Sequence, residues 1–315
     1  DAFTTMGVTP TMSCTPYLFP GYTPQRGDHL AWAESSAVVF ANSIVGARSN
    51  REGGPSALAA AIVGRTPRYG YHLDEERLAG IVVEVRCPVR DVADFGALSY
   101  VVGQQVGSAT LWFADLADWL PPLPADITLG GAAGDRLKTL GAGLAAYGAV
   151  ALFHIAGYTP EAQDLGERLI KPNARRLTID SLDPGYRVMD ADPDLRQIDL
   201  VTIGCPHASL SEIEQIAGML QGQHVKTQLW VTTARIIRER ARAAGWVQTI
   251  EAAGGQVVAD TCAVVAPMRS IGVTSMATNA GKMACYAPAH SQVKMRYGSL
   301  EQCVAAAVTG MWNGQ

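Results

Sequence analysis

The C-terminal half of the chain alternates short apolar runs with helical stretches, and this alternation constrains the fold more than any other feature. Apolar runs at residues 198–203 and 229–232 are each followed by a segment with helical periodicity, and a further strand is expected at 256–259. Strands that alternate with helices form parallel, doubly wound sheets, in which ligands collect at the carboxyl ends of the strands. We therefore expect an α/β chain with mainly parallel, doubly wound sheets flanked by helices.

The length of the chain predicts two lobes. Its 315 residues exceed the ~250–300 residues at which a single hydrophobic core stops growing. A proline-rich segment at residues 116–129 is typical of a linker or a lid, so we expect an N-terminal lobe at 1–125 and a C-terminal lobe at 126–315. Within the second lobe, the charged segment 160–176 is interpreted as a solvated helix.

Composition excludes several classes of partner. The net charge is −4 and the 25 basic residues are spread thinly, so neither nucleic acid nor a membrane surface is expected to bind. The six cysteines form no CxxC pair, which suits a reducing compartment. No apolar run approaches ~18 residues, and the N-terminus lacks the order of a signal peptide. We expect a cytoplasmic protein with a small-molecule partner.

Several cysteines lie where strands should end. Cys205 follows the apolar run at 198–203 in a Gly-Cys-Pro-His turn, and the next helix N-terminus favours a thiolate there. Cys262 follows its own strand in the same way, and Cys14 lies on a proline-rich loop. For a lone cysteine in such a turn, a small buried core residue is the more common case. Together they suit an iron–sulfur cluster, held by thiolates from separate loops, better than zinc.

Two polar features are further candidates for a site. The segment 46–58, GARSNREGGPSAL, combines a polar run with a double glycine at a helix start, so it could hold a carboxylate or phosphate or simply be a solvated loop. Arg48, Arg51 and Arg65 could together contact a phosphate. Glu34, in the buried helix expected at 30–45, is either an acid at a helix edge or an active-site carboxylate.

These residues resemble one known family, aconitase X, a divergent branch of the aconitase superfamily. The matching stretches run from end to end of the chain. They are SCTPY (13–17), WAESSAVVFANS (32–43), GARSNREGGPSALAAA (46–61), GRTPRYGYHLD (64–74), GCPHASLSEI (204–213), DTCAVVAP (260–267), ATNAGKMACY (277–286) and RYGSLEQC (296–303). The resemblance implies an aconitase-like fold and a lyase that eliminates water from a hydroxy acid with the help of an iron–sulfur cluster.

The resemblance also implies roles for individual residues. The implied cluster ligands are Cys14, Cys205 and Cys262, with Cys285 as a possible further one. The implied catalytic residues are Glu34, Ser35, Glu52 and Lys282. The implied substrate-binding residues are Asn50, Arg51, Gly53, Ser56, His207 and Asn279, with Arg51 holding the substrate carboxylate as a bidentate fork.

Two substrates are associated with the family, and we expect cis-3-hydroxy-L-proline, typical of bacterial members, in preference to phosphomevalonate. Family members also need a small swivel domain, fused or as a second chain, which commonly supplies a serine base. Neither that domain nor the usual residues before the CTPY motif are found here, so we expect this chain to be part of a longer protein. A non-catalytic iron–sulfur subunit and a zinc hydrolase are the alternatives.

Overall fold

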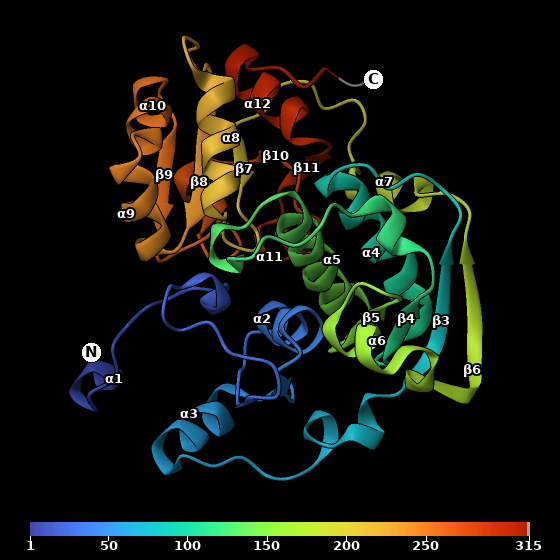
Figure 1. The fold of residues 1–315 in the computed structure, drawn as a ribbon. Coiled ribbons are helices and arrows are strands. Elements are labelled where there is room, and N and C mark those ends of the chain that lie inside the picture. Colours follow the sequence, from blue (N-terminus) through green and yellow to red (C-terminus); the bar gives the residue numbers. More distant parts are fainter. Residues whose placement is uncertain (314–315) are drawn as a thin grey trace.

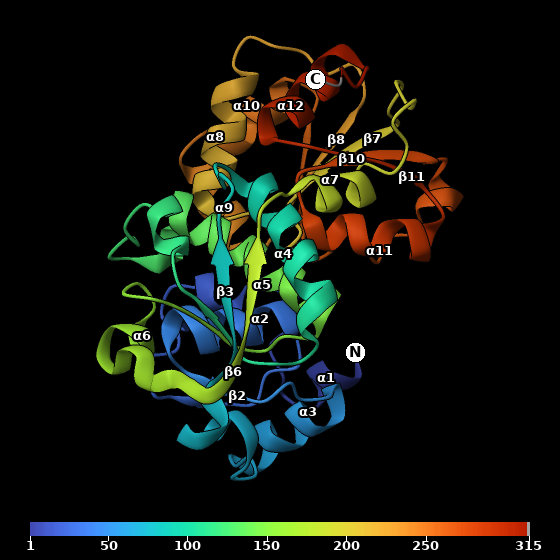
Figure 2. The same ribbon diagram turned by 90° about the vertical axis from the view of Figure 1, so that its right-hand side faces the viewer.

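The computed structural model describes residues 1–313 and contains two large parallel sheets that share a continuous hydrophobic core (Figure 1). Among these residues, no helix is both long and apolar enough to cross a membrane. The fold agrees with the predicted α/β class and with sheets flanked by helices. Figure 2 shows the two sheets one above the other, with helices packed beside them.

The N-terminal segment precedes both sheets. A short parallel pair, β1 (His29–Leu30) with β2 (Arg48–Ser49), brackets a buried helical segment. That segment was expected to be one helix from 30 to 45; it begins later, as α2 (Ser35–Phe40), and continues as one wider turn (Ala41–Val45). After β2, α3 (Gly54–Val63) lies on the surface with no buried residue. The chain begins with a short helix, α1 (Ala2–Thr5).

The first large sheet has four parallel strands in the order β5-β4-β3-β6. Its strands are β3 (Ala79–Val85), β4 (Leu111–Phe113), β5 (Phe153–Ile155) and β6 (Ile170–Ile179). Its helices are α4 (Val92–Val106), α5 (Ala132–Gly148), α6 (Pro160–Leu165) and α7 (Asp183–Met189). Residue 125 lies between β4 and β5, so the division expected there falls inside this sheet. The prolines near 121–124 belong to a loop that connects its strands.

One prediction in this region was wrong. The segment 160–176 was interpreted as a solvated helix, but only Pro160–Leu165 is α-helical, and from Ile170 the chain runs as the long strand β6. The strand lies at the edge of its sheet, where one side of the backbone needs no partner strand and charged residues and Pro172 are tolerated. The polar composition of β6 therefore led to the prediction of a helix where the chain forms a strand.

The second large sheet has five parallel strands in the order β11-β10-β7-β8-β9. Its strands are β7 (Leu200–Ile203), β8 (Gln228–Thr233), β9 (Gln256–Ala259), β10 (Ser275–Thr278) and β11 (Lys294–Tyr297). Its helices are α8 (Leu210–Leu220), α9 (Arg235–Ala243), α10 (Trp246–Ala252), α11 (Gly281–Ser291) and α12 (Leu300–Thr309). The predicted alternation of strand and helix is confirmed here.

Candidate active site

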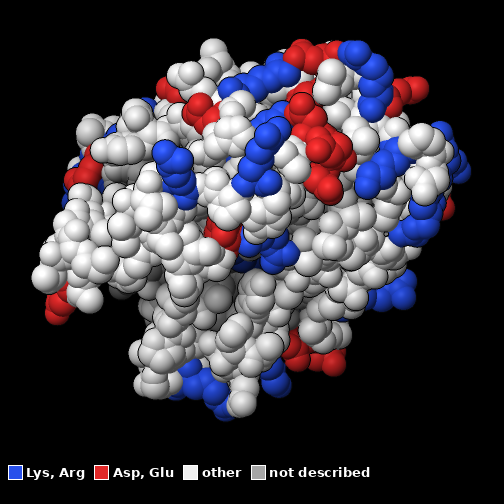
Figure 3. Space-filling model, turned by 90° about the horizontal axis from the view of Figure 1, so that it is seen from below, with Lys and Arg blue, Asp and Glu red and all other residues white. Residues whose placement is uncertain are grey.

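A crevice is expected where the chain reverses direction in the five-stranded sheet. The sheet starts at β7, grows through β8 and β9, and then returns to place β10 on the other side of β7. Loops that leave neighbouring strands at such a switch point diverge and make room for a ligand. Cys205 follows β7, while Asn279 and Lys282 follow β10, so the switch point brings together residues predicted from two separate motifs. The surface seen from below Figure 1 is hollowed, with acidic and basic side chains beside the hollow (Figure 3).

The turn that carries Cys205 is pinned to the neighbouring strand. Gly204 has φ +103°, and a Cβ there would overlap the carbonyl oxygen of Thr232 in β8. The Thr232 hydroxyl donates to the Gly204 carbonyl at 2.7 Å, and the Ala208 N–H donates to the Thr232 carbonyl at 2.8 Å. Only glycine fits this approach, which explains the residue before Cys205.

His207 joins the three cysteine-bearing loops. Its backbone N–H donates to the Cys14 sulfur at 3.2 Å, and its ring Nε2 lies 3.1 Å from the carbonyl oxygen of Thr261, the neighbour of Cys262. Because a carbonyl only accepts, Nε2 carries the hydrogen, and Nδ1 accepts from the Ser13 hydroxyl at 3.1 Å. Burial lowers the pKa of His207, which keeps the ring neutral. Both ring nitrogens are occupied, so His207 positions the loops.

The three thiols of Cys14, Cys205 and Cys262 are free and form one electrostatic group. Burial raises the pKa of Cys14 to about 11 and raises that of Cys205 further, and the neighbouring thiols add to both shifts. Thiols bind metal as thiolates, so loading this group must release protons.

Within residues 1–313, no set of three His, Cys, Asp or Glu side chains is close enough for a single metal ion. The thiolates that hold an iron–sulfur cluster lie farther apart than the ligands of a single metal ion, because they bind different irons. Three free thiols from three loops are a donor set that fits such a cluster.

An ion pair lies beside the thiols. The Lys282 ammonium, at the start of α11, is paired with the Glu34 carboxylate. Glu34 also caps α2 by accepting from the Ser36 N–H at 3.3 Å, and it accepts from the Ser36 hydroxyl at 2.8 Å. Burial alone would lower the pKa of Lys282, but the charge of Glu34, its hydrogen bond and the neighbouring Cys205 and Cys14 together outweigh it, and the net shift is upward. Burial alone would raise the pKa of Glu34, but the charge of Lys282 and the hydrogen bonds from Lys282 and Ser36 together outweigh it, and the net shift is downward. Both groups are therefore charged at neutral pH, and both act on the pKa of Cys14 and Cys205.

Cys285 has a different neighbour. It lies one helical turn after Lys282, and its thiol is beside the hydroxyl of Tyr147 in α5. Tyr147 donates to the Gly281 carbonyl at 2.9 Å and so ties α5 to the start of α11. The sequence analysis missed Tyr147, since a tyrosine in a glycine- and alanine-rich helix carries no signal of a site.

The NREGGP loop makes contacts of its own. Asn50 is buried, and its amide accepts from the Tyr71 N–H at 2.9 Å and donates to the Tyr69 carbonyl at 3.0 Å. A Cβ on Gly70, at φ +58°, would overlap the Asn50 side-chain oxygen. Arg51 donates to the Ala149 carbonyl at 2.8 Å. In this structure the side chains of Asn50 and Arg51 therefore hold the backbone of other segments.

The other predicted residues lie at helix starts or near them. The Ser56 hydroxyl donates to Glu52 Oε2 at 2.7 Å, next to Gly53, which caps α3. The second Glu52 oxygen is buried without a hydrogen-bond partner among the described residues. Ser35 is the first residue of α2, and Asn279 is buried just after β10.

A buried ionic network contacts the turn that carries Cys205. Lys138 of α5 pairs with Glu212 of α8, lies 3.5 Å from Asp135, and donates to the His207 carbonyl at 3.1 Å. All three charged side chains are nearly inaccessible to solvent. The network joins a helix of the four-stranded sheet to a helix of the five-stranded one. The sequence analysis missed it, although an aspartate and a lysine three residues apart in a glycine- and alanine-rich helix are a usable signal.

This network predicts a pH dependence of stability. Burial and the charge of Asp135 raise the pKa of Glu212 from 4.5 to about 7. Between these two values the folded chain holds a proton that the unfolded chain has lost, so stability falls as pH rises from 4.5 to 7. Glu212→Gln is expected to flatten that dependence in urea-unfolding measurements. The exposed Glu214→Gln on the same helix is the control, and an equally steep dependence in Glu212→Gln would contradict the assignment.

Comparison with known proteins decides the family. Three aconitase X domain models match the chain, the first domain at residues 1–75, the second at 79–184 and the third at 198–309. The phosphomevalonate dehydratase large subunit of Methanosarcina mazei is 40% identical over 98% of this chain and 72% of its own length. The chain belongs to the aconitase X family. The second and third domains of the family coincide with the four-stranded and five-stranded sheets.

Other members of the aconitase X family extend the comparison. The crystal structure of Thermococcus kodakaraensis aconitase X in its holo-form superposes with a TM-score of 0.84 at 40% identity, covering 97% of this chain and 74% of the other. The cis-3-hydroxy-L-proline dehydratase of Pseudomonas aeruginosa is 35% identical over 98% of this chain, which spans 52% of that protein. The relatives named here by activity are dehydratases, and the chain is a hydro-lyase of their family.

Proposed function

We propose that this chain is the large subunit of an iron–sulfur hydro-lyase that removes water from a β-hydroxy acid. The observation that carries the proposal is the convergence of three free thiols around His207, beside the Glu34–Lys282 ion pair. The charged pair beside the thiols favours a catalytic subunit over a non-catalytic iron–sulfur subunit, because cluster binding alone does not require it.

The cysteines and the Glu34–Lys282 ion pair have different roles in the proposed reaction. Cys14, Cys205 and Cys262 would hold the cluster, which when bound supplies a Lewis acid for the hydroxyl or carboxylate of the substrate. Both candidate substrates carry the departing hydroxyl on the carbon β to a carboxylate, so negative charge builds up on that carboxylate as the α-proton leaves. The Lys282 ammonium stabilises this charge, and Glu34 orients the ammonium. The base that takes the proton comes from the small domain, in line with the family resemblance.

The similarity favours phosphomevalonate as the substrate. Phosphomevalonate dehydratase large subunits of Methanosarcina mazei and Methanothermobacter thermautotrophicus are 40% and 42% identical to the chain, against 34–35% for two cis-3-hydroxy-L-proline dehydratases. The preference for cis-3-hydroxy-L-proline drawn from the sequence therefore becomes the second candidate. The relatives' designation as large subunits supports a small subunit as partner.

The test is an anaerobic assay of the chain assembled with its small domain. Iron and labile sulfide are measured first, and both substrates are then followed by mass for loss of one water. We expect a coloured iron–sulfur protein that dehydrates phosphomevalonate. Turnover of cis-3-hydroxy-L-proline alone would reverse the choice of substrate, a loaded cluster with no turnover would support the non-catalytic reading, and zinc without sulfide would support a hydrolase.

Lys282→Met is expected to lower kcat by about 10²–10³-fold, the usual loss when one preorganised charge at a developing anion is removed. Iron content should not change, since Lys282 is not a ligand. Lys282→Arg keeps the charge and should recover part of the rate, and Lys294→Met, an exposed lysine of β11, is the control. Wild-type turnover in Lys282→Met would remove Lys282 from the mechanism.

A further inference from the structure

Lys282, the second residue of α11, is held by two other parts of the chain. Its ammonium is paired with Glu34, which caps α2 in the N-terminal segment. The residue before it, Gly281, accepts a hydrogen bond at its carbonyl from the hydroxyl of Tyr147, at 2.9 Å, near the end of α5. Segments from the first, second and third domains of the family therefore meet at this lysine.

The hydrogen bond from Tyr147 acts on the backbone of Lys282. The Gly281 carbonyl and the Lys282 nitrogen belong to one planar peptide group, so a donor that fixes the carbonyl also fixes the direction in which the chain enters Lys282. No side chain caps the start of α11. Among the described residues, the Tyr147 hydroxyl is the only side-chain group that hydrogen-bonds to Gly281.

Gly281 also packs closely against α4. A Cβ built on Gly281 would lie 3.2 Å from the Cα of Gly96, so the two backbones approach each other without side chains between them. Figure 2 shows α11 beside α4. Two glycines have no side chains that interlock, so this contact limits how close the helices come but gives little resistance to sliding. The directional hydrogen bond from Tyr147 supplies that resistance.

Tyr147 is itself well placed to act as a fixed donor. Its ring lies edge-on to the ring of Tyr100 in α4, with the centroids 5.0 Å apart and the planes at 85°. Its hydroxyl also lies beside the thiol of Cys285, one turn after Gly281 on α11. The hydroxyl therefore contacts the first turn of α11 at two points, while the ring contact does not depend on it.

We propose that Tyr147 is a positioning residue for Lys282 in the dehydration reaction. Its hydroxyl fixes the first peptide group of α11, and with it the point from which the Lys282 side chain reaches the substrate carboxylate. A preorganised charge is effective because it needs no reorientation as the reaction proceeds, so added freedom at the base of the side chain lowers the rate. The inference rests on the proposed function for the role of Lys282, whereas the contact between Tyr147 and Gly281 does not.

The kinetic test uses Tyr147→Phe in the assembled holoenzyme, which keeps the ring and removes the hydroxyl. We expect kcat to fall about tenfold, near the upper end of the effect of one hydrogen bond, with little change in KM. This split is expected because Lys282 acts on charge that builds up only in the transition state. In the slow Lys282→Met background, Tyr147→Phe should cause no further fall, whereas two independent effects would multiply.

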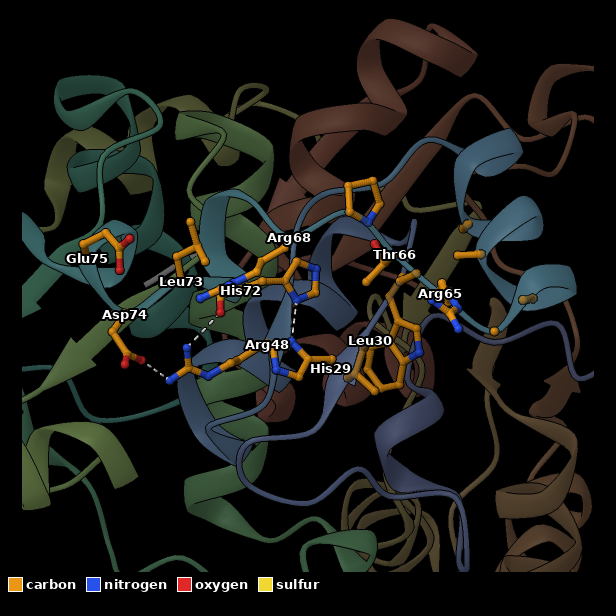
Figure 4. A pocket seen from close by; sticks show the side chains of 17 residues that line it. His29, Leu30, Arg48, Arg65, Thr66, Arg68, His72, Leu73, Asp74 and Glu75 are labelled. Carbon is orange, nitrogen blue, oxygen red and sulfur yellow. Dashed lines mark hydrogen bonds and ion pairs between the residues drawn. The ribbon is translucent and has the colours of Figure 1, made fainter.

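Two controls remove a hydroxyl elsewhere. Tyr158 also donates to a backbone carbonyl, that of Pro121 at 2.6 Å, so Tyr158→Phe removes the same kind of bond away from α11. Thr66 lines a cavity of about 990 Å³ beside α3 (Figure 4), and neither Tyr147 nor Lys282 lines that cavity. The Thr66 hydroxyl has no hydrogen-bond partner among the described residues, so Thr66→Val breaks no such bond. Both variants should keep the wild-type kcat.

Chemical labelling follows Lys282 without turnover. Acetylation of the assembled protein by a water-soluble succinimidyl ester, measured for each peptide by mass spectrometry, reports how often the Lys282 amine is free of Glu34. We expect Lys282 to be acetylated about 2–10-fold faster in Tyr147→Phe, the range that corresponds to one neutral hydrogen bond. The exposed Lys294 of β11 should be acetylated at an unchanged rate.

Three results would overturn the proposal: an unchanged kcat in Tyr147→Phe, an unchanged rate of Lys282 acetylation, or an equal fall of kcat in the wild-type and Lys282→Met backgrounds. If the wild type dehydrates neither substrate, the proposed function fails. The acetylation rates then still decide whether Tyr147 holds Lys282 in place.

Discussion

Alanine substitution of Cys205 or Cys262 is expected to remove the cluster and to lower dehydratase activity more than about 100-fold. Loss of a group that merely orients a metal ligand already costs about 10–100-fold, and loss of the ligand itself should cost more. The structure adds that the His207 ring holds the loops through Ser13 and Thr261, without using the thiols of Cys205 or Cys262. The variants should therefore keep their fold.

The measurements are iron and sulfide content, visible absorbance and turnover, with circular dichroism to verify folding. Cys303→Ala is the matched control, because Cys303 is a free cysteine buried in α12 and packed in the hydrophobic core. Full cluster content in Cys205→Ala or Cys262→Ala would overturn the ligand assignment. Cys285→Ala is expected to retain iron, because its thiol lies beside Tyr147.

Lys138→Met is expected to destabilise the protein by about 3–5 kcal/mol, the usual effect of removing one partner from a buried ion pair. The substitution leaves the carboxyl groups of Glu212 and Asp135 buried without their cation, and it leaves the His207 carbonyl without a donor. Urea unfolding of the unloaded protein measures the loss. Because the His207 turn also carries Cys205, cluster affinity should fall with it.

Two further variants make this prediction specific. Lys138→Met/Glu212→Gln removes one of the two carboxylates that Lys138→Met leaves without a cation, so it should recover part of the lost stability. If the two substitutions acted independently, their losses of stability would add. Lys171→Met, at an exposed lysine of β6, should change stability by less than about 0.5 kcal/mol. A change in Lys138→Met as small as that of Lys171→Met would show that the network contributes nothing.

The sequence predicted the five-stranded sheet well, whereas in the four-stranded sheet the edge strand β6 was mistaken for a helix. In the first, short β-branched runs alternate with amphipathic helices, and the capping boxes at Ser209 and Ser299 mark two helix starts. In the second, the edge strand β6 is polar, and the proline-rich loop near residue 125 resembles a linker. Local patterns report burial, and an edge strand is only partly buried, so its pattern is weak.

The sequence determined which residues could act in a site, because thiols at the ends of predicted strands and the NREGGP motif can be recognised from the sequence alone. The tertiary structure decided how they are used. It placed Cys14, Cys205 and Cys262 around His207. It also showed that Asn50 and Arg51 hydrogen-bond to backbone groups of other segments, and that Lys138 contacts the His207 carbonyl. Contacts between segments more than a hundred residues apart depend on strand order and helix packing, and no local pattern encodes that order. The sequence thus determined the set of reactive groups, and the order of strands in the sheet decided which of them meet.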